Sequence, residues 1–215
     1  PIGDENPREK TPYINYTIIA LNSIVFILLL SLRNPVSAYM HYGLIPSQIK
    51  PIAFISYQFL HAGIFHIVGN MLFLWIFGDN IEDRLGPALY LFFYLLGGIA
   101  AAATHILLYP GSHVPTVGAS GAVSAVMGAY VVLYPRCMIK LWYFFWYFLY
   151  IRTGVSYIRA MVLMPLWFGW QLFLAVITAS LGAETSIAYW AHLGGFAFGV
   201  AAGFIMKISR LGESL

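Results

Sequence analysis

Long apolar stretches separated by short polar segments dominate this sequence. A helix needs about 20 apolar residues to cross roughly 30 Å of hydrocarbon. Six stretches reach or approach that length, and they predict six membrane spans at residues 16–32, 64–78, 87–108, 119–134, 158–181 and 189–208. The second and fourth spans are short, and irregular backbone beside them is tolerated only within protein or along a water-filled cavity. The pattern therefore predicts an all-α, polytopic six-helix membrane bundle.

One apolar stretch, residues 139–151, is rich in aromatic residues but too short to cross a membrane. Lys140 and Arg152 bracket it. Because Trp and Tyr favour the headgroup level of a bilayer, we predict an interfacial or re-entrant segment there. A seventh span is the alternative interpretation.

The composition leads to the same class of protein. Hydrophobic residues make up 60% of the 215 positions and charged residues 9%, whereas soluble domains carry roughly 25% charged residues. Too little polar surface is available to cover a globule in water. Cys137 is the only cysteine, so a disulfide within the chain is excluded.

The basic residues predict the orientation of the chain in the membrane. With six spans, nine Lys and Arg residues fall on the side of the two termini and two, Arg33 and Lys50, on the other side. Cytoplasmic segments carry the excess of Lys and Arg. We therefore predict a cytoplasmic tail at 1–15, a membrane domain at 16–208 and a cytoplasmic tail at 209–215. Residues 1–12 lack the pattern of a signal peptide, so the first span is expected to be retained.

Polar residues within spans are candidates for function because burying them in lipid is costly. Candidates occur near the start of the second span (His66 and Asn70), the fourth (Ser120) and the sixth (His192). These three spans run in the same direction, so the candidates should lie at a similar depth on the side away from the termini. His61 lies on a different helical face from His66 and is a weaker candidate.

Ser120 lies within a Gly-Ala-Ser-Gly segment, residues 118–121, at the expected start of a helix. The first N–H groups of a helix lack partners within it and favour negative charge. Gly118 and Gly121 allow sharp turns and close approach of a peptide. The segment therefore suits a nucleophilic serine, although small residues are also common where membrane helices pack together.

His192 is the candidate general base. Small residues recur at every fourth position beside it, and a similar set follows Ser120, which predicts close contact between the two helices. The two sets are Ala191, Gly195, Gly199 and Gly203, and Gly121, Ala125 and Gly128. Such contact could bring the imidazole within the 2.6–3.2 Å of the hydroxyl that a general base requires.

No Asp or Glu falls within the spans of Ser120 and His192, so a hydrolase would use a Ser–His dyad. His66 and Asn70 are four residues apart and share a helix face, and as neutral donors they suit an oxyanion site. A purely structural hydrogen-bonding pair is the alternative. Glu82 and Arg84 are predicted to order the following loop. No zinc-binding His-Glu-x-x-His motif, pair of intramembrane aspartates or nucleic-acid-binding patch is visible.

Together these motifs resemble the rhomboid proteases. The resemblance covers about residues 57–203 and rests on the segments 61–71, 82–86, 118–121 and 191–199. It implies a six-helix intramembrane serine protease with Ser120 as nucleophile and His192 as base. It also implies an oxyanion site formed by His66, Asn70 and the Ser120 backbone N–H. Glu82, Arg84, Gly195 and Gly199 are expected to be structural.

The resemblance implies transmembrane protein substrates in a lipid bilayer and no cofactor, metal or nucleic acid. A bacterial inner membrane is the expected location. Some bacterial members carry a Tyr that stacks on the base where this chain has Ser124, which leaves open what orients His192. A catalytically silent relative that binds membrane clients is the alternative function, and a small channel or transporter is a more distant one.

Overall fold

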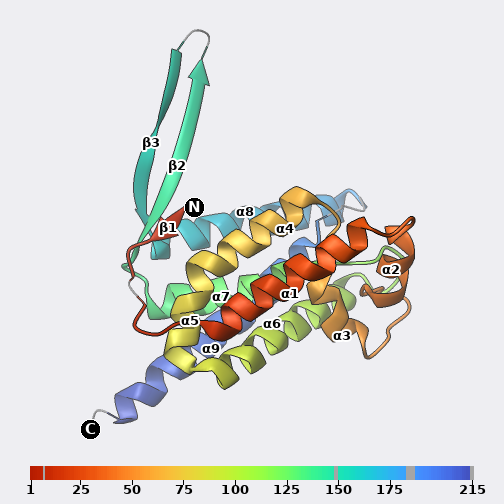
Figure 1. The fold of residues 1–215 in the computed structure, drawn as a ribbon, viewed down its shortest axis with the longest axis horizontal. Coiled ribbons are helices and arrows are strands. Elements are labelled where there is room, and N and C mark those ends of the chain that lie inside the picture. Colours follow the sequence, from red (N-terminus) through yellow and green to blue (C-terminus); the bar gives the residue numbers. More distant parts are fainter. Residues whose placement is uncertain (7, 148–149, 183–186, 214–215) are drawn as a thin grey trace.

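The computed structural model describes residues 1–6, 8–147, 150–182 and 187–213, with side chains as far as residue 209. Helices that lie side by side along the long axis form the body of the molecule (Figure 1). The helices of this body are α1 (Tyr13–Leu30), α4 (Ile64–Phe73) with η2 (Leu74–Gly78) and α5 (Asp79–Leu85), α6 (Pro87–Leu108), α7 (Ser120–Leu133), α8 (Ala160–Ser180) and α9 (Tyr189–Glu213). The predicted helical membrane bundle is confirmed.

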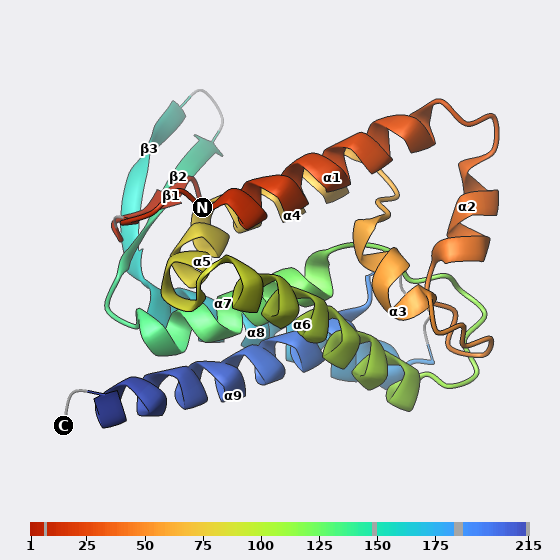
Figure 2. The same cartoon turned by 60° about the horizontal axis from the view of Figure 1, so that its bottom comes forward.

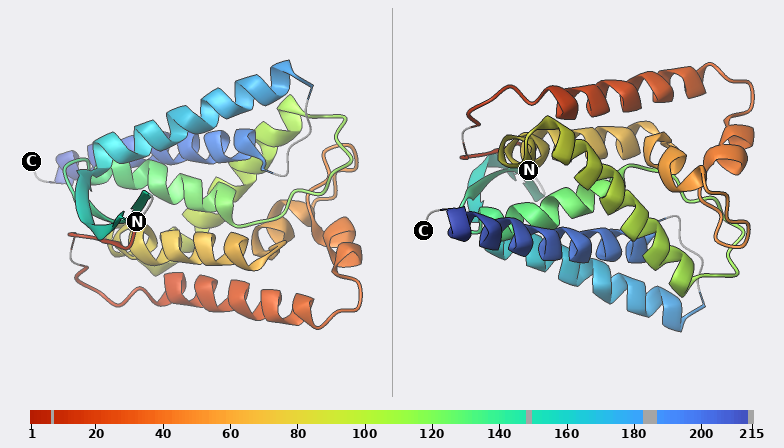
Figure 3. Two further views of the ribbon diagram at one scale, coloured as in Figure 1. Left: turned by 90° about the horizontal axis from the view of Figure 1, so that it is seen from above. Right: turned by 90° about the horizontal axis from the view of Figure 1, so that it is seen from below.

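Five of these helices are long and apolar enough to cross a membrane, when α4, η2 and α5 are taken as the single helix Ile64–Leu85. The remaining predicted span is α7, which has 14 residues. Helix α7 lies in the middle of the bundle, as the views from above and below show (Figure 3). Eleven of its residues are buried, whereas α1, α6 and α8 expose apolar side chains on their outer faces. Lipid would cover those outer faces.

The second span is longer than predicted. It was expected to end at Gly78, but the helix continues to Leu85 through the π-helical turn η2. Asn15 of α1 inserts at this turn, where its Nδ2 donates to the Leu74 carbonyl oxygen at 2.9 Å. The hydroxyl of Tyr90 on α6 donates to Asn15 Oδ1 at 2.7 Å. A buried polar side chain thus satisfies a carbonyl that the wider turn frees.

Glu82 and Arg84 lie in the helical extension α5 rather than in a loop. The Glu82 carboxylate accepts hydrogen bonds from the backbone N–H groups of Ile14 at 3.0 Å and Asn15 at 2.7 Å. It therefore caps the first turn of α1, where backbone donors lack partners. Arg84 donates to the Met206 carbonyl oxygen on α9 at 3.4 Å. Both residues connect helices at the end of the bundle that carries the chain termini.

The described residues of the segment 139–151 lie in two paired strands, which the sequence did not predict, and residues 148 and 149 lie outside the described part of the chain. Strands β2 (Met138–Tyr147) and β3 (Tyr150–Arg159) pair antiparallel, and the short β1 (Gly3–Asp4) adds to β2 at its base. The predicted fifth span, from residue 158, begins as α8 only at Ala160. Aromatic and β-branched residues favour strands, so this segment pairs with the chain that follows it.

The long first loop forms α2 (Pro35–Tyr42), α3 (Ala53–Ser56) and the short turn η1 (Tyr57–Phe59). These elements lie at the end of the bundle opposite the termini, as Figure 2 shows. Leu44 and Thr116 exchange two backbone hydrogen bonds, of 2.9 and 2.8 Å. The loop is thereby tied to the segment that leads into α7.

Candidate active site

Ser120 and His192 are in hydrogen-bond contact, with 2.8 Å between Ser120 Oγ and His192 Nε2. Ser120 is the first residue of α7, and His192 lies in the first turn of α9. Both side chains are half-buried. The structure therefore brings together two residues that are 72 positions apart in the sequence.

The contact depends on the close approach of the α7 and α9 backbones. A Cβ atom on Gly195 would lie 2.1 Å from the carbonyl oxygen of Gly121, and one on Gly199 would lie 1.9 Å from that of Ala125. Neither position has room for a side chain. The two sets of small residues that the sequence displays are thus in direct contact, and this contact sets the separation of the helices that carry Ser120 and His192.

Gln171 of α8 holds the other nitrogen of His192. The distance between His192 Nδ1 and Gln171 Oε1 is 3.2 Å, and Gln171 is buried. Because an amide oxygen can only accept, Nδ1 carries the proton and Nε2 presents its lone pair to Ser120. This is the tautomer that a general base needs. Beside this pair, Phe168 stacks on Phe196 with ring centroids 3.8 Å apart.

The sequence interpretation did not single out Gln171. The available signal was a Gln within an otherwise apolar stretch, which marks a functional candidate in a membrane span. Ser124, which stands where some relatives carry a Tyr, forms a hydrogen bond within its own helix. Its hydroxyl donates to the Ser120 carbonyl oxygen at 2.7 Å.

Gly118 lies between His66 and Ser120. Its φ of +128° lies in a region that L side chains rarely adopt. A Cβ there would lie 2.6 Å from His66 Nε2 and 3.7 Å from Ser120 Oγ. The Gly118 N–H donates to the Tyr57 carbonyl oxygen at 2.9 Å, which fixes the loop before α7. The glycine is thus required for both its backbone conformation and its lack of a side chain.

His61 contacts both His66 and Asn70. Its Nε2 is 3.0 Å from Asn70 Nδ2 and 3.5 Å from the Ala119 backbone N. The His61 ring is fully buried and meets the His66 ring edge-on, with centroids 5.0 Å apart. Since an amide nitrogen can only donate, Nε2 accepts from Asn70. His61 therefore positions Asn70 rather than standing apart from the pair.

The described residues form an uncharged polar site at the ends of α4, α7 and α9 that lie away from the chain termini. No carboxylate among them hydrogen-bonds to Ser120 or His192, and they contain no group of three His, Cys, Asp or Glu side chains placed to hold a metal ion. In such an arrangement the imidazole can activate the serine hydroxyl by taking its proton, and the neutral donors can bind a developing oxyanion.

Comparisons with known proteins identify the family of this chain. The Rhomboid domain family model matches residues 49–209. Rhomboid protein 1, mitochondrial, of Saccharomyces cerevisiae is 30% identical over 165 residues, which cover 73% of this chain and 42% of the yeast protein. Rhomboid protease GluP of Bacillus subtilis is 29% identical over 155 residues, which cover 71% of this chain and 25% of GluP. The alignments therefore span less than half of these relatives. With three quarters of its length matched by the family model, this chain belongs to the rhomboid family.

Proposed function

We propose that this chain is an intramembrane serine protease that hydrolyses peptide bonds in or near transmembrane segments of other proteins. The observation that supports this most strongly is the 2.8 Å contact between Ser120 Oγ and His192 Nε2, with Nδ1 of the same ring held by Gln171. A serine hydroxyl is a weak nucleophile until a positioned base removes its proton.

In the proposed reaction, His192 Nε2 accepts the proton of Ser120 Oγ while Oγ attacks the carbonyl carbon of the peptide bond. The tetrahedral intermediate collapses as His192 donates that proton to the leaving amine, which breaks the C–N bond. Water then attacks the acyl-serine, with His192 again as base, and releases the carboxylic acid and free Ser120. Protons and bonds balance without a cofactor or ATP.

The oxyanion of the intermediate would be bound by His66, Asn70 and the Ser120 backbone N–H. Support comes from Gly118, where a Cβ would approach both His66 and Ser120. The Asn70 amide has two N–H donors, and one of them reaches His61, so the other remains for the substrate. The N-terminus of α7 adds its dipole to these donors. Each donor in such a site contributes a factor of about 10²–10³ to kcat.

Gln171 acts as a positioning residue in this proposal. It takes the part that an acidic residue plays in a catalytic triad, because it accepts the Nδ1 proton and fixes the ring. A neutral amide avoids the cost of burying a carboxylate. In this proposal Gln171 orients His192, since the chain has Ser124 instead of a Tyr that could stack on the imidazole.

The short α7 supports a site below the membrane surface. Its 14 residues rise about 21 Å, which is less than the roughly 30 Å of hydrocarbon. If the C-terminal end of α7 lies near the surface on the side of the chain termini, Ser120 at the other end of the helix lies within the bilayer, below the opposite surface. Substrates would be single-span proteins whose helix unwinds easily near that end, since a peptide bond within an intact helix is shielded from attack.

The distribution of Lys and Arg supports an orientation with both termini in the cytoplasm and the site toward the opposite face. The relatives include a Bacillus subtilis protein and mitochondrial proteins. A bacterial inner membrane therefore stays a prediction.

A fluorophosphonate probe tests the proposal on detergent-purified protein. We expect covalent labelling of the wild type and none of Ser120→Ala or His192→Ala, with thermal unfolding midpoints close to that of the wild type. Ser124→Ala serves as the matched control. The probe should not react with this neighbouring serine, so the variant should be labelled as strongly as the wild type. A well-folded wild type that does not react would instead indicate a silent member of the family that binds membrane clients.

A further inference from the structure

The β2–β3 hairpin carries a dense group of exposed aromatic side chains. Nine of the 22 residues from 138 to 159 are Phe, Trp or Tyr, against 17% aromatic residues overall. Trp142 is 58% exposed and Tyr147 is 72% exposed. Single exposed aromatics are common, but a contiguous group on this scale marks an interaction surface.

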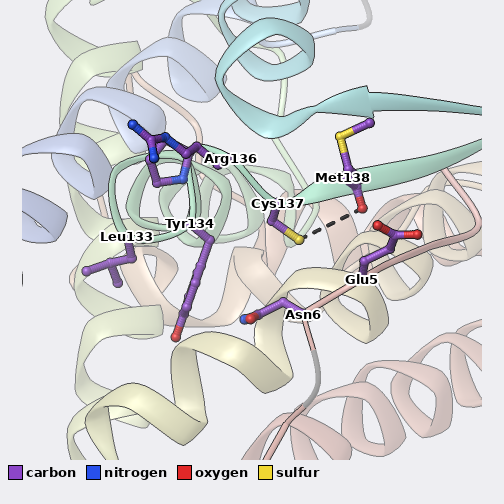
Figure 4. Close-up of a pocket in the computed structure, with 8 residues that line it drawn as sticks. Glu5, Asn6, Leu133, Tyr134, Arg136, Cys137 and Met138 are labelled. Atoms are coloured by element: carbon purple, nitrogen blue, oxygen red, sulfur yellow. Dashed lines mark hydrogen bonds between the residues drawn. The ribbon is translucent and has the colours of Figure 1, made fainter.

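The base of the hairpin is fixed to the bundle. Ile139 is fully buried, and the backbone N–H of Ala160 donates to the Cys137 carbonyl oxygen at 2.9 Å. Strand β1 adds to β2 there, and the Asp4 carboxylate accepts hydrogen bonds from Tyr130 and Asn80. A shallow hollow of about 410 Å³ separates the N-terminal segment from the chain between α7 and β2 (Figure 4). These contacts set the direction in which the hairpin projects.

That direction is across the bundle. Figure 1 shows the hairpin rising beside the end of the helices rather than extending along them, and in the view from above it is foreshortened (Figures 1 and 3). Membrane helices run between the two bilayer surfaces. A hairpin fixed across them, at the end where α7 finishes and α8 begins, therefore runs along the surface on the side of the termini.

The chemistry of the hairpin fits that surface. Trp and Tyr are the residues enriched at membrane–water interfaces. Residues 138–159 include Lys140, Arg152 and Arg159 but no Asp or Glu. Asp4 lies near Lys140 and offsets its charge, whereas Arg152 and Arg159 are exposed. A positive, aromatic surface beside a bilayer is complementary to anionic headgroups.

The strand pairing divides the aromatic residues between two faces. Cross-strand partners share a face, and the register pairs Trp142 with Val155 and Trp146 with Ile151, while Phe145 pairs with Arg152. One face thus carries Trp142, Phe144, Trp146, Ile151 and Val155, with Lys140, Tyr157 and Arg159 at its base, and we call it the Trp face. The other carries Tyr143, Phe145, Tyr147, Tyr150 and Arg152, which we call the Tyr face.

We propose that the hairpin is a lipid-binding element that lies along the leaflet on the side of the termini, with the Trp face toward the acyl chains and the Tyr face toward anionic headgroups. This assignment is independent of the proposed protease activity. The hairpin lies at the opposite end of the bundle from Ser120 and His192, so a silent member of the family would bind lipid in the same way.

Spin labels on single cysteines test the depth of each face in nanodiscs of phosphatidylcholine with phosphatidylglycerol. The background is Cys137→Ser, and the matched positions are Phe144→Cys and Phe145→Cys, whose side chains are 55% and 56% exposed on opposite faces. Gly111→Cys in an exposed loop marks water, and Leu172→Cys on the outside of α8 marks lipid. Oxygen and a water-soluble nickel complex serve as relaxing agents.

We expect the label at 144 to approach the lipid marker and the label at 145 to lie at headgroup depth. Two labels that match Gly111→Cys would place the hairpin in water and overturn the proposal. Equal depth at 144 and 145 would overturn the assignment of the faces. Short distances between labels on different copies, without lipid contact, would show an interface between copies of this chain instead.

The charge preference has its own test, which measures association of spin-labelled phosphatidylglycerol relative to phosphatidylcholine. Arg152→Gln should lower the relative affinity about fivefold, because Arg152 lies on the Tyr face and a basic residue near the surface attracts anionic lipid. Ser156→Gln, at an exposed position on the same strand and the same face without a change of charge, is the matched control. An unchanged lipid preference in Arg152→Gln would contradict the recognition of anionic headgroups.

Discussion

The two ends of the bundle both hold polar groups between helices, but they use different kinds of group. At the end with Ser120 and His192, the partners are neutral: Gln171 holds the imidazole and His61 holds Asn70. At the end with the termini, carboxylates are used. Glu82 accepts from the backbone of α1, and Asp83 accepts from the backbone N–H groups of Glu9 and Lys10.

The difference follows from what each end has to do. A carboxylate that accepts backbone N–H groups is stabilised permanently and suits a fixed structural contact. A proposed catalytic site needs charge to develop only during the reaction, so neutral donors that wait for an oxyanion are preferable. The comparison therefore predicts that changes at the first end alter turnover, whereas changes at the second alter stability.

The largest effect is expected from the oxyanion donors. Asn70→Ala should lower kcat for a transmembrane substrate by about 10²–10³ with little change in the unfolding midpoint, since one such donor has about that value. Proteolysis in detergent or nanodiscs gives the measurement. Val68→Ala, an exposed position on the same helix, is the control. Normal turnover by Asn70→Ala would assign this residue to packing alone.

A smaller loss is expected when the base loses its orienting partner. Gln171→Leu keeps the size of the side chain but removes the acceptor, and kcat should fall about tenfold to a hundredfold while KM stays unchanged. Gln171→Glu keeps an acceptor oxygen and should restore most of the activity. If Leu and Glu behave alike, Gln171 acts only through packing.

The contact between α7 and α9 gives the next effect, which acts on stability. Gly199→Ala places a methyl group against the Ala125 carbonyl oxygen, and overpacking of this kind costs about 1–3 kcal/mol. Gly169→Ala on α8 has open space at the Cβ position and should be neutral or slightly stabilising, because Ala favours helix more than Gly. Equal unfolding midpoints for the two variants would contradict the close contact of the two backbones.

A capping substitution tests the second end. Glu82→Gln weakens the acceptor for the first turn of α1 and should cost about 1 kcal/mol of stability, as the loss of a helix cap does. Its kcat should match that of the wild type when measured below the unfolding transition. A large drop in kcat for a well-folded Glu82→Gln protein would show that the two ends are coupled.

The smallest effect concerns pH. Burial raises the pKa of Asp4 above the ordinary range of a carboxyl group. The folded state then binds the Asp4 proton more tightly than the unfolded state, so stability falls as pH rises from the ordinary pKa through the raised one. Thermal unfolding across this window should show the decline, and Asp4→Asn should flatten it. A decline of the same size in Asp4→Asn would assign the pH dependence to another group.

The sequence predicted the membrane bundle well because the signal is local and strong. The span at 87–108 agrees at both ends with α6, where Pro87 occupies the first helical turn after Gly86. The second span was predicted too short, because charged residues 79–85 are typical of a loop outside the membrane. The carboxylates of Glu82 and Asp83 instead accept backbone N–H groups between residues 9 and 15, and no local pattern shows that contact.

The candidate site was also visible in part. Ser120, His192, His66 and Asn70 stand out as polar residues within apolar stretches, and the small residues beside Ser120 and His192 indicate close helix contact. Gln171 and His61 did not stand out in the same way, because their importance lies in partners far along the chain. The role of each residue stays a prediction until the variants are measured.

The hairpin shows where local patterns are ambiguous. Residues 139–151 are apolar and aromatic, which fits an interfacial helix, a re-entrant segment or a strand. Only the pairing of β2 with β3, and of β1 with the base, decides among them. A strand needs a partner for its backbone groups, and the partner is chosen in three dimensions.

By itself, then, the sequence determined that the chain crosses a membrane as a helical bundle and which polar residues its spans carry, because lipid selects apolar length and makes each polar exception conspicuous. The tertiary structure decided the 2.8 Å contact of Ser120 with His192, the acceptor that Gln171 presents and the direction of the hairpin. Those features depend on how closely α7, α8 and α9 approach one another, and that distance is set by packing across the bundle rather than by any one segment.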